Sequence, residues 1–107
     1  MNETAVDDLW NYAHQWQYPI DMGIVRAVKV LRDAGVNTVE SCEGGDGHSY
    51  PEPTVKFSGG PAQGWHALGV LMDYGLPVSD IGQRWAITYG LPTGPSWYVT
   101  FWKKLDV

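Results

Sequence analysis

The last quarter of the chain sets the class of fold, because it contains two consecutive stretches with the composition of β-strands. "QRWAITYG" (83–90) and "SWYVTFWKK" (96–104) are rich in aromatic and β-branched residues, and "LPTGP" between them suits a hairpin loop. The second stretch alternates two bulky sets, Trp97, Val99 and Phe101 on one face and Tyr98, Thr100 and Trp102 on the other. We expect one face to pack on helices and the other to contact a ligand, a partner or the N-terminal segment.

The rest of the chain predicts helices and two further strands. Apolar residues recur at helical spacing in 3–16, 21–35 and 61–75, and Asp21 is placed to cap the second of these helices. Residues 36–41 and 53–59 have strand composition. This order predicts an α+β fold over one domain, residues 1–107. We expect a two-layer sandwich in which two main helices pack on one face of a four-stranded, mainly antiparallel sheet.

The helix predicted at 61–75 contains two glycines in its interior. Trp65, Leu68 and Met72 share the stripe that is expected to be buried. Gly64 and Gly69 each weaken such a helix by about 1 kcal/mol relative to alanine. Their presence therefore predicts either a weak helix or close packing against one of the glycines.

Charge and hydropathy exclude several classes of partner. The net charge is -5, and the seven basic residues are scattered, so the chain is not expected to bind DNA or RNA polymers. No apolar run approaches the roughly 18 residues of a membrane span, and the acidic N-terminus lacks the apolar region of a secretory signal. The single cysteine cannot form an internal disulfide. We therefore expect no membrane partner and a cytoplasmic location.

The aromatic content is high for a chain of this size. Six tryptophans and six tyrosines occur among 107 residues, more ring volume than a small core encloses easily. Some rings are expected to be partly exposed at a ligand pocket or an oligomer interface. A ligand pocket alone would not cover so many rings, so the composition also predicts a homo-oligomer.

The segment "SCEGGDGHSYPEP" (41–53) holds the only cysteine and, six residues later, a histidine. A metal site would use Cys42 and His48 with Glu43 or Asp46, but no second cysteine and no paired-ligand motif is present. We therefore expect neither a metal nor another cofactor. A second hypothesis makes Cys42 a nucleophile activated by His48, with Glu43 or Asp46 orienting the imidazole, in a hydrolase or transferase.

A third hypothesis treats the same segment as a binding loop. Glycines let backbone N–H groups converge on a phosphate or carboxylate, while hydroxyls and an imidazole add polar contacts. Basic residues on the neighbouring strands would supply charge, and aromatic rings would stack on a base. The predicted ligand site comprises Ser41, Glu43, Gly44, Gly45, His48, Tyr50, Lys56, Arg84, Trp85 and Trp97.

The motif "VESCEGGDGHSYPEPTVKFSG" resembles a family of small proteins from bacteriophages and prophages that share an S-C-x-G-G-x-G-H core. The resemblance covers roughly residues 23–103 and includes a following P-x-V-x-F and a tryptophan-rich end. The matching residues are Gly35, Thr38, Ser41, Cys42, Gly44, Gly45, Gly47, His48, Pro53, Val55 and Phe57. The resemblance labels a family and implies no particular activity, although small phage proteins of this size often act against host defence, some by sequestering nucleotide messengers.

The favoured interpretation is a small phage-type protein that binds a nucleotide-like small molecule in the host cytoplasm without turnover. Two alternatives remain open at this point. One is the enzyme that depends on Cys42 and His48. The other is an interaction module that inhibits a host protein through its aromatic surface.

Overall fold

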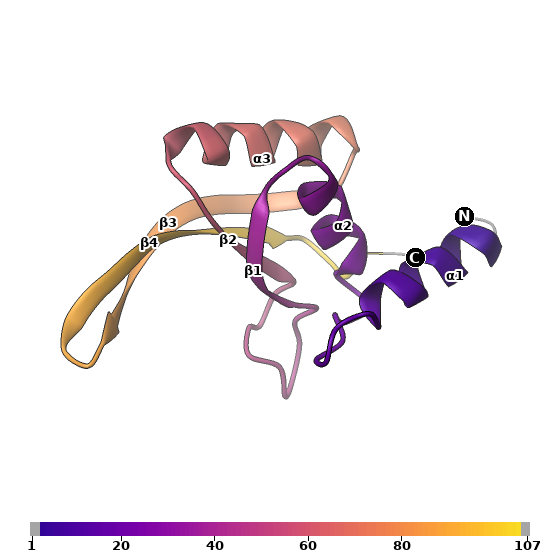
Figure 1. The fold of residues 1–107 in the computed structure, drawn as a ribbon, viewed down its shortest axis with the longest axis horizontal. Coiled ribbons are helices and arrows are strands. Elements are labelled where there is room, and N and C mark those ends of the chain that lie inside the picture. The colour runs from indigo at the N-terminus through magenta and orange to yellow at the C-terminus, as the bar shows by residue number, and fades with distance from the viewer. Residues whose placement is uncertain (1–2, 106–107) are drawn as a thin grey trace.

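The computed structural model describes residues 3–105, and the side chains from residue 8 onward. These residues form three helices, α1 (Glu3–Ala13), α2 (Val25–Asp33) and α3 (Pro61–Asp73), and four strands, β1 (Asn37–Cys42), β2 (Thr54–Ser58), β3 (Val78–Thr88) and β4 (Leu91–Phe101). The strands form one sheet in the order β1-β2-β4-β3, and every neighbouring pair is antiparallel (Figure 1). The predicted α+β class with a four-stranded antiparallel sheet is confirmed.

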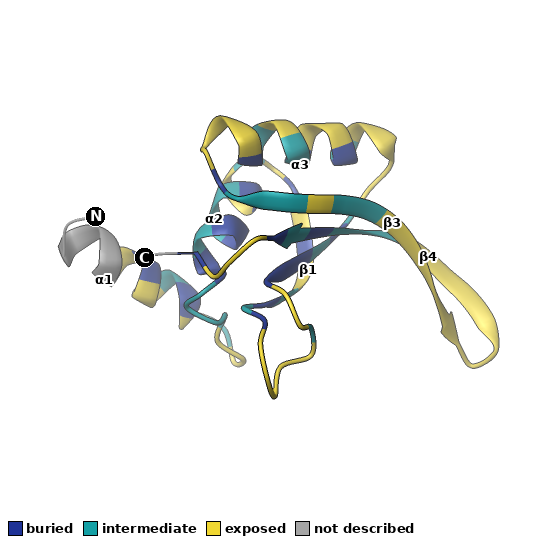
Figure 2. Ribbon diagram, turned by 180° about the vertical axis from the view of Figure 1, so that it is seen from behind, coloured by how far each residue is buried: buried dark blue, intermediate teal, exposed yellow. Residues whose placement is uncertain are grey.

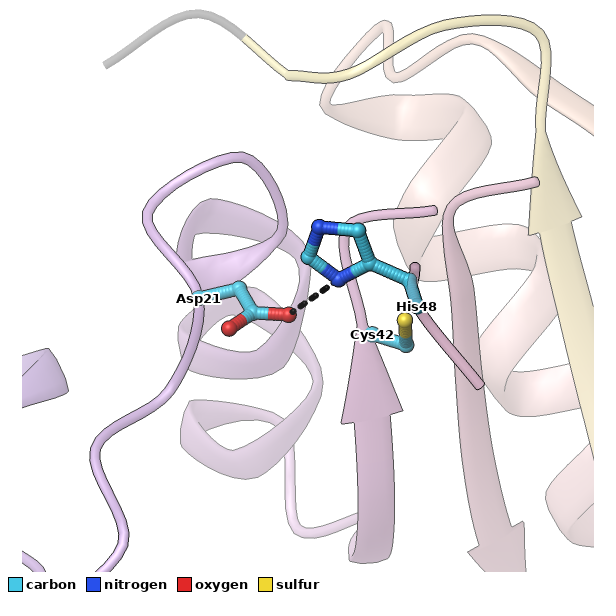
Figure 3. A group of neighbouring side chains, drawn as sticks. All are labelled: Asp21, Cys42 and His48. Atoms are coloured by element: carbon cyan, nitrogen blue, oxygen red, sulfur yellow. Dashed lines mark ion pairs between the residues drawn. The ribbon is translucent and has the colours of Figure 1, made fainter. Parts of the chain in front are cut away.

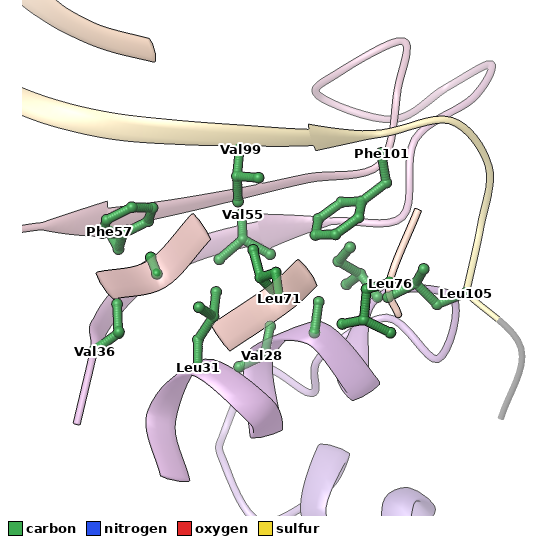
Figure 4. Close-up of a cluster of buried hydrophobic side chains, with 13 residues drawn as sticks. Val28, Leu31, Val36, Val55, Phe57, Leu71, Leu76, Val99, Phe101 and Leu105 are labelled. Atoms are coloured by element: carbon green, nitrogen blue, oxygen red, sulfur yellow. The ribbon is translucent and has the colours of Figure 1, made fainter. Parts of the chain in front are cut away.

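The core lies where α2 and α3 meet the two central strands. Alternate residues of β2 and β4 enter one buried cluster with side chains from both helices, as period-2 strands and an amphipathic helix require (Figure 4). Its largest fully buried members are Phe57, Phe101, Ile24, Leu31, Leu71, Val55 and Val99. The other residues of β2 and β4 therefore point to the opposite side of the sheet, where they are free to form a site.

The start of α2 differs from the sequence expectation. The helix begins at Val25, and no side chain caps it. The backbone carbonyl of Asp21, rather than its carboxylate, accepts the N–H groups of Ile24 and Val25. The carboxylate instead accepts the backbone N–H of Glu43, so Asp21 joins the turn before α2 to the end of β1. Helix α1 also ends earlier than expected, at Ala13.

Helix α3 buries a different stripe from the one predicted. Gly64, Ala67 and Leu71 are buried, whereas Trp65 and Met72 are 78% and 60% exposed. Apolar residues occur around the whole of α3, so their spacing alone does not select the buried face.

The hairpin between β3 and β4 is longer than the sequence indicated. Residues 91–95 were predicted to be a loop, but they belong to β4, and the turn is Tyr89-Gly90. Both turn residues have positive φ, 51° and 79°, as a two-residue turn between twisted strands requires. Residues 83–95, here called the hairpin arm, are all exposed and project beyond the rest of the sheet (Figure 2). No helix within residues 3–105 is long and apolar enough to cross a membrane.

Candidate functional site

Three potential ligating or catalytic side chains converge beside the loop between β1 and β2. Asp21 comes from the turn before α2, Cys42 ends β1, and His48 lies in the loop that follows (Figure 3). One ligand atom of each residue lies within 4.8 Å of the others. His48 Nδ1 is 3.7 Å from Asp21 Oδ2. Cys42 is buried, while the side chains of Asp21 and His48 are 37% and 34% exposed, so the cluster opens to solvent on one side.

The glycines of the loop explain how the chain turns back over Cys42. Gly44 has φ of +82°, and a Cβ added there would lie 2.4 Å from the backbone carbon of Glu52. Gly45 and Gly47 also have positive φ, a conformation that side-chain-bearing residues rarely adopt. The Gly44 N–H donates to Cys42 Sγ at 3.4 Å. The loop backbone thus fixes the sulfur and returns His48 to it.

Glu43 anchors this loop to the rest of the protein. Its carboxylate accepts from Lys104 Nζ at 2.8 Å and from the Gly23 N–H at 3.2 Å. The hydrogen bond from Lys104, together with the Gly23 N–H, lowers the pKa of Glu43 below its usual value. The sequence suggested Glu43 as a ligand contact or as the acid that orients His48. In the structure the acid that pairs with the His48 ring is Asp21, while the Glu43 carboxylate is bonded to Lys104 and Gly23.

A second group of functional side chains lies on the side of the sheet away from the core. Lys56 Nζ and Arg84 Cζ lie 5.7 Å and 4.9 Å from the centroid of the Tyr98 ring, each over that ring. The Tyr50 ring meets Tyr98 edge-on at 6.3 Å. We call the surface formed by Lys56, Arg84, Tyr98, Tyr50 and Gly82 the Tyr98 face. Strand register creates it, because Lys56 and Gly82 are the partners of Tyr98 on its two sides.

The Tyr98 face has free space beside its rings. A Cβ added at Gly82 would meet no atom within 4 Å. Two adjoining hollows, of about 160 and 440 Å³, border this face. They share the lining residues Glu52, Arg84 and Thr100. A planar group would therefore have room to lie over the sheet beside Tyr98 and Arg84.

The Tyr98 face carries two cations at its centre, and acids lie at its rim and in its larger hollow, which Asp80 lines. Among the described residues, neither Lys56 nor Arg84 forms an ion pair. Burial, with the nearby Glu40 carboxylate, raises the pKa of Tyr50 to about 12, so its hydroxyl stays protonated near neutral pH. Glu40 on β1 pairs in register with Lys56, and Glu52 lines both hollows.

The structure brings together some of the site residues that the sequence suggested. Tyr50, Lys56 and Arg84 meet at the Tyr98 face, while Glu43, Gly44, Gly45 and His48 form the loop beside Cys42. Ser41 pairs with the core residue Val55 and lines a separate hollow between α2 and β1. In that hollow the Arg32 guanidinium already donates to the carbonyl and hydroxyl of Thr38.

The two tryptophans suggested as stacking partners lie elsewhere. Trp97 packs parallel to Phe57 at the core and donates its indole N–H to the Gly59 carbonyl. Trp85 is 61% exposed on the hairpin arm. The ring at the centre of the face belongs to Tyr98, which the alternation of β4 had placed opposite Trp97.

The chain was compared with protein-family models, with curated proteins and with solved structures, and no match was found.

Proposed function

We propose that this protein binds a small, nucleotide-like ligand on the Tyr98 face and holds it without turnover. The observation that carries the proposal is the placement of two cations, neither in an ion pair with another described residue, over one tyrosine ring, beside a glycine that leaves the sheet surface open. A ligand with both a negative charge and a planar ring matches this combination of groups.

The cations supply the phosphate contacts in this proposal. Arg84 offers a planar fork of N–H donors that suits a phosphate, and Lys56 adds a second positive charge. The two come from strands on either side of β4, so a phosphate near Tyr98 would be approached from both sides. Desolvation under a bound ligand would strengthen both contacts.

The rings and acids supply the contacts to the rest of the ligand. A base would stack on the Tyr98 ring by displacing one of the two cations that lie over it, and stacking of this kind contributes roughly 1–3 kcal/mol per base. The Tyr50 hydroxyl remains protonated, and it would donate to the ligand by giving up its contact with the Glu40 carboxylate. Glu40 and Glu52 would accept from ribose hydroxyls or an exocyclic amino group. The net charge of -5 favours such a compact ligand over a nucleic-acid polymer.

The phage resemblance supports a role for such binding in the host cytoplasm. A protein that sequesters a nucleotide messenger needs affinity and no catalytic step, and the cations and rings of the Tyr98 face support this proposal. We therefore place the ligand among the nucleotide signals that a host defence system would produce.

A second copy of the chain is proposed as the partner of the hairpin arm. Trp85, Ile87, Tyr89 and Leu91 are all more than 60% exposed there, and Arg84 is the only charged residue in 83–95. An arm with one charged residue, several exposed apolar side chains and free strand edges is suited to pair with an identical arm about a two-fold axis. Such pairing would cover rings that the monomer leaves in water.

Calorimetric titration with a panel of mononucleotides, dinucleotides and cyclic oligonucleotides tests the ligand proposal. At least one nucleotide should bind, and its nucleoside without phosphate should bind at least about tenfold more weakly. Arg84→Gln and Lys56→Gln should each weaken binding, whereas Lys103→Gln, which lines a separate hollow with Arg26 and Tyr74, should not. Gly82→Val should block binding while preserving the fold, because its side chain enters open space on a strand. Equal binding by the wild type and Gly82→Val would place the ligand elsewhere.

A further inference from the structure

The cluster of Asp21, Cys42 and His48 takes no part in the ligand site proposed on the Tyr98 face. It combines a carboxylate, a thiol and an imidazole, which are three ligand types of protein zinc sites. Hard cations such as Mg²⁺ and Ca²⁺ prefer oxygen ligands, so the sulfur and nitrogen favour a softer divalent metal. The sequence argued against a metal because it has no second cysteine and no paired-ligand motif, and the fold brings Asp21 beside Cys42 and His48 as a further potential ligand.

The spacing of the donor atoms fits a metal better than it fits a direct hydrogen-bonded triad. Zinc–ligand bonds of about 2.0–2.3 Å place the donors of a tetrahedral site roughly 3.3–3.8 Å apart. His48 Nδ1 and Asp21 Oδ2 are 3.7 Å apart, too far for a hydrogen bond. All three donor atoms lie within 4.8 Å of one another, so shifts of about 1 Å would complete the site.

Backbone N–H groups hold two of these donor atoms in place, as hydrogen bonds around the ligands of metal sites do. The Glu43 N–H donates to Asp21 Oδ2 at 3.1 Å, and the Gly44 N–H donates to Cys42 Sγ at 3.4 Å. Such outer contacts orient ligands and stabilise their charged forms. The Cys42 side is buried, whereas the Asp21 and His48 side reaches solvent, so a fourth position faces outward.

We propose that Asp21, Cys42 and His48 bind one Zn²⁺ ion per chain, with the fourth position open to water or another ligand. Three protein ligands and an open position are the pattern of catalytic zinc sites, whereas structural sites use four protein ligands. The ion would also fix the loop of residues 43–53, which carries Tyr50 and Glu52 to the edge of the Tyr98 face.

Titration of the metal-free protein with Co²⁺ tests this site. The wild type should bind one Co²⁺ with strong visible bands of four-coordinate cobalt and a near-ultraviolet thiolate-to-cobalt band, and Zn²⁺ should displace it. Cys42→Ser, His48→Gln and Asp21→Asn should each lower zinc affinity by at least about 100-fold, since even outer-shell changes cost 10- to 100-fold. Asp21→Asn retains an acceptor for the Glu43 N–H, so circular dichroism should show an intact fold.

Matched controls and a second readout keep the test decisive. Asp46→Asn changes an acid of the same loop, and His66→Gln changes a histidine on α3, and both should bind zinc as the wild type does. Bound Zn²⁺ should also slow alkylation of Cys42 in the wild type. A cobalt spectrum without the thiolate band, equal zinc affinity in wild type and Cys42→Ser, or alkylation unaffected by zinc would each overturn the proposal.

Discussion

Replacing Gly64 by alanine should destabilise the protein, although alanine is the better helix former. Alanine gains about 1 kcal/mol over glycine in a helix interior. At this position the new methyl carbon would lie 2.5 Å from the Trp97 ring, which is fixed by Phe57 and by its bond to the Gly59 carbonyl. Overpacking costs about 1–3 kcal/mol, and a lost indole hydrogen bond about 1 kcal/mol. The net expectation is a loss of roughly 1–3 kcal/mol.

Gly69→Ala in the same helix is the matched control. A Cβ at Gly69 meets no atom within 4 Å, so this variant should gain up to about 1 kcal/mol. Urea unfolding of both variants measures the difference, and in thermal unfolding each 1 kcal/mol corresponds to roughly 4–8 °C. If both alanines stabilise the protein equally, Trp97 does not pack against α3 as described.

The remaining predictions concern the loop and the hairpin arm. Gly44→Ala should lower the free energy of unfolding by more than about 2 kcal/mol, because its methyl group would clash with the backbone of residue 52. Gly47→Ala, whose methyl group would lie in open space, should lower it by only about 1–2 kcal/mol through backbone strain. Urea unfolding compares the two variants. The pKa of Glu43 in the folded protein lies below its usual 4.5. The ionised Glu43 carboxylate therefore stabilises the folded protein above pH 4.5, and this contribution to the free energy of unfolding is lost as the pH falls through the folded pKa. Glu43→Gln should therefore be less stable than the wild type at pH 7, by less than about 1 kcal/mol since Lys104 is exposed, and the gap should close in acid melts. Ile87→Glu should convert an oligomer to a monomer in sedimentation at micromolar concentration, and a wild type that is already monomeric would contradict the proposed arm pairing.

Local periodicity predicted the elements and the class of fold. The alternation of Val99 with Tyr98 correctly separated the two faces of β4, because the side-chain period of a strand is fixed. It failed for α3, where apolar residues surround the helix and tertiary contacts with the core and with Trp97 select the buried side. The composition of 91–95 predicted a loop, because two prolines and a glycine normally interrupt strands, whereas these residues belong to β4.

The candidate sites were only partly predictable, since each depends on contacts between distant segments. Cys42 and His48 were recognisable by their proximity in the sequence, but Asp21 is more than 20 residues away and had a plausible local role as a cap. Lys56 and Arg84 were suggested by charge alone. Their common centre, Tyr98, follows from the strand order β1-β2-β4-β3, which no local pattern specifies.

Native mass spectrometry of the wild type and Gly82→Val, expressed in the same cells, tests the central claim most directly. The wild type should carry a small phosphorylated molecule that is released intact on denaturation, and the variant should be free of it because the added side chain fills the space beside Tyr98. An identical bound molecule in both proteins, or a wild type that remains empty and binds no member of the nucleotide panel, would contradict ligand binding on the Tyr98 face.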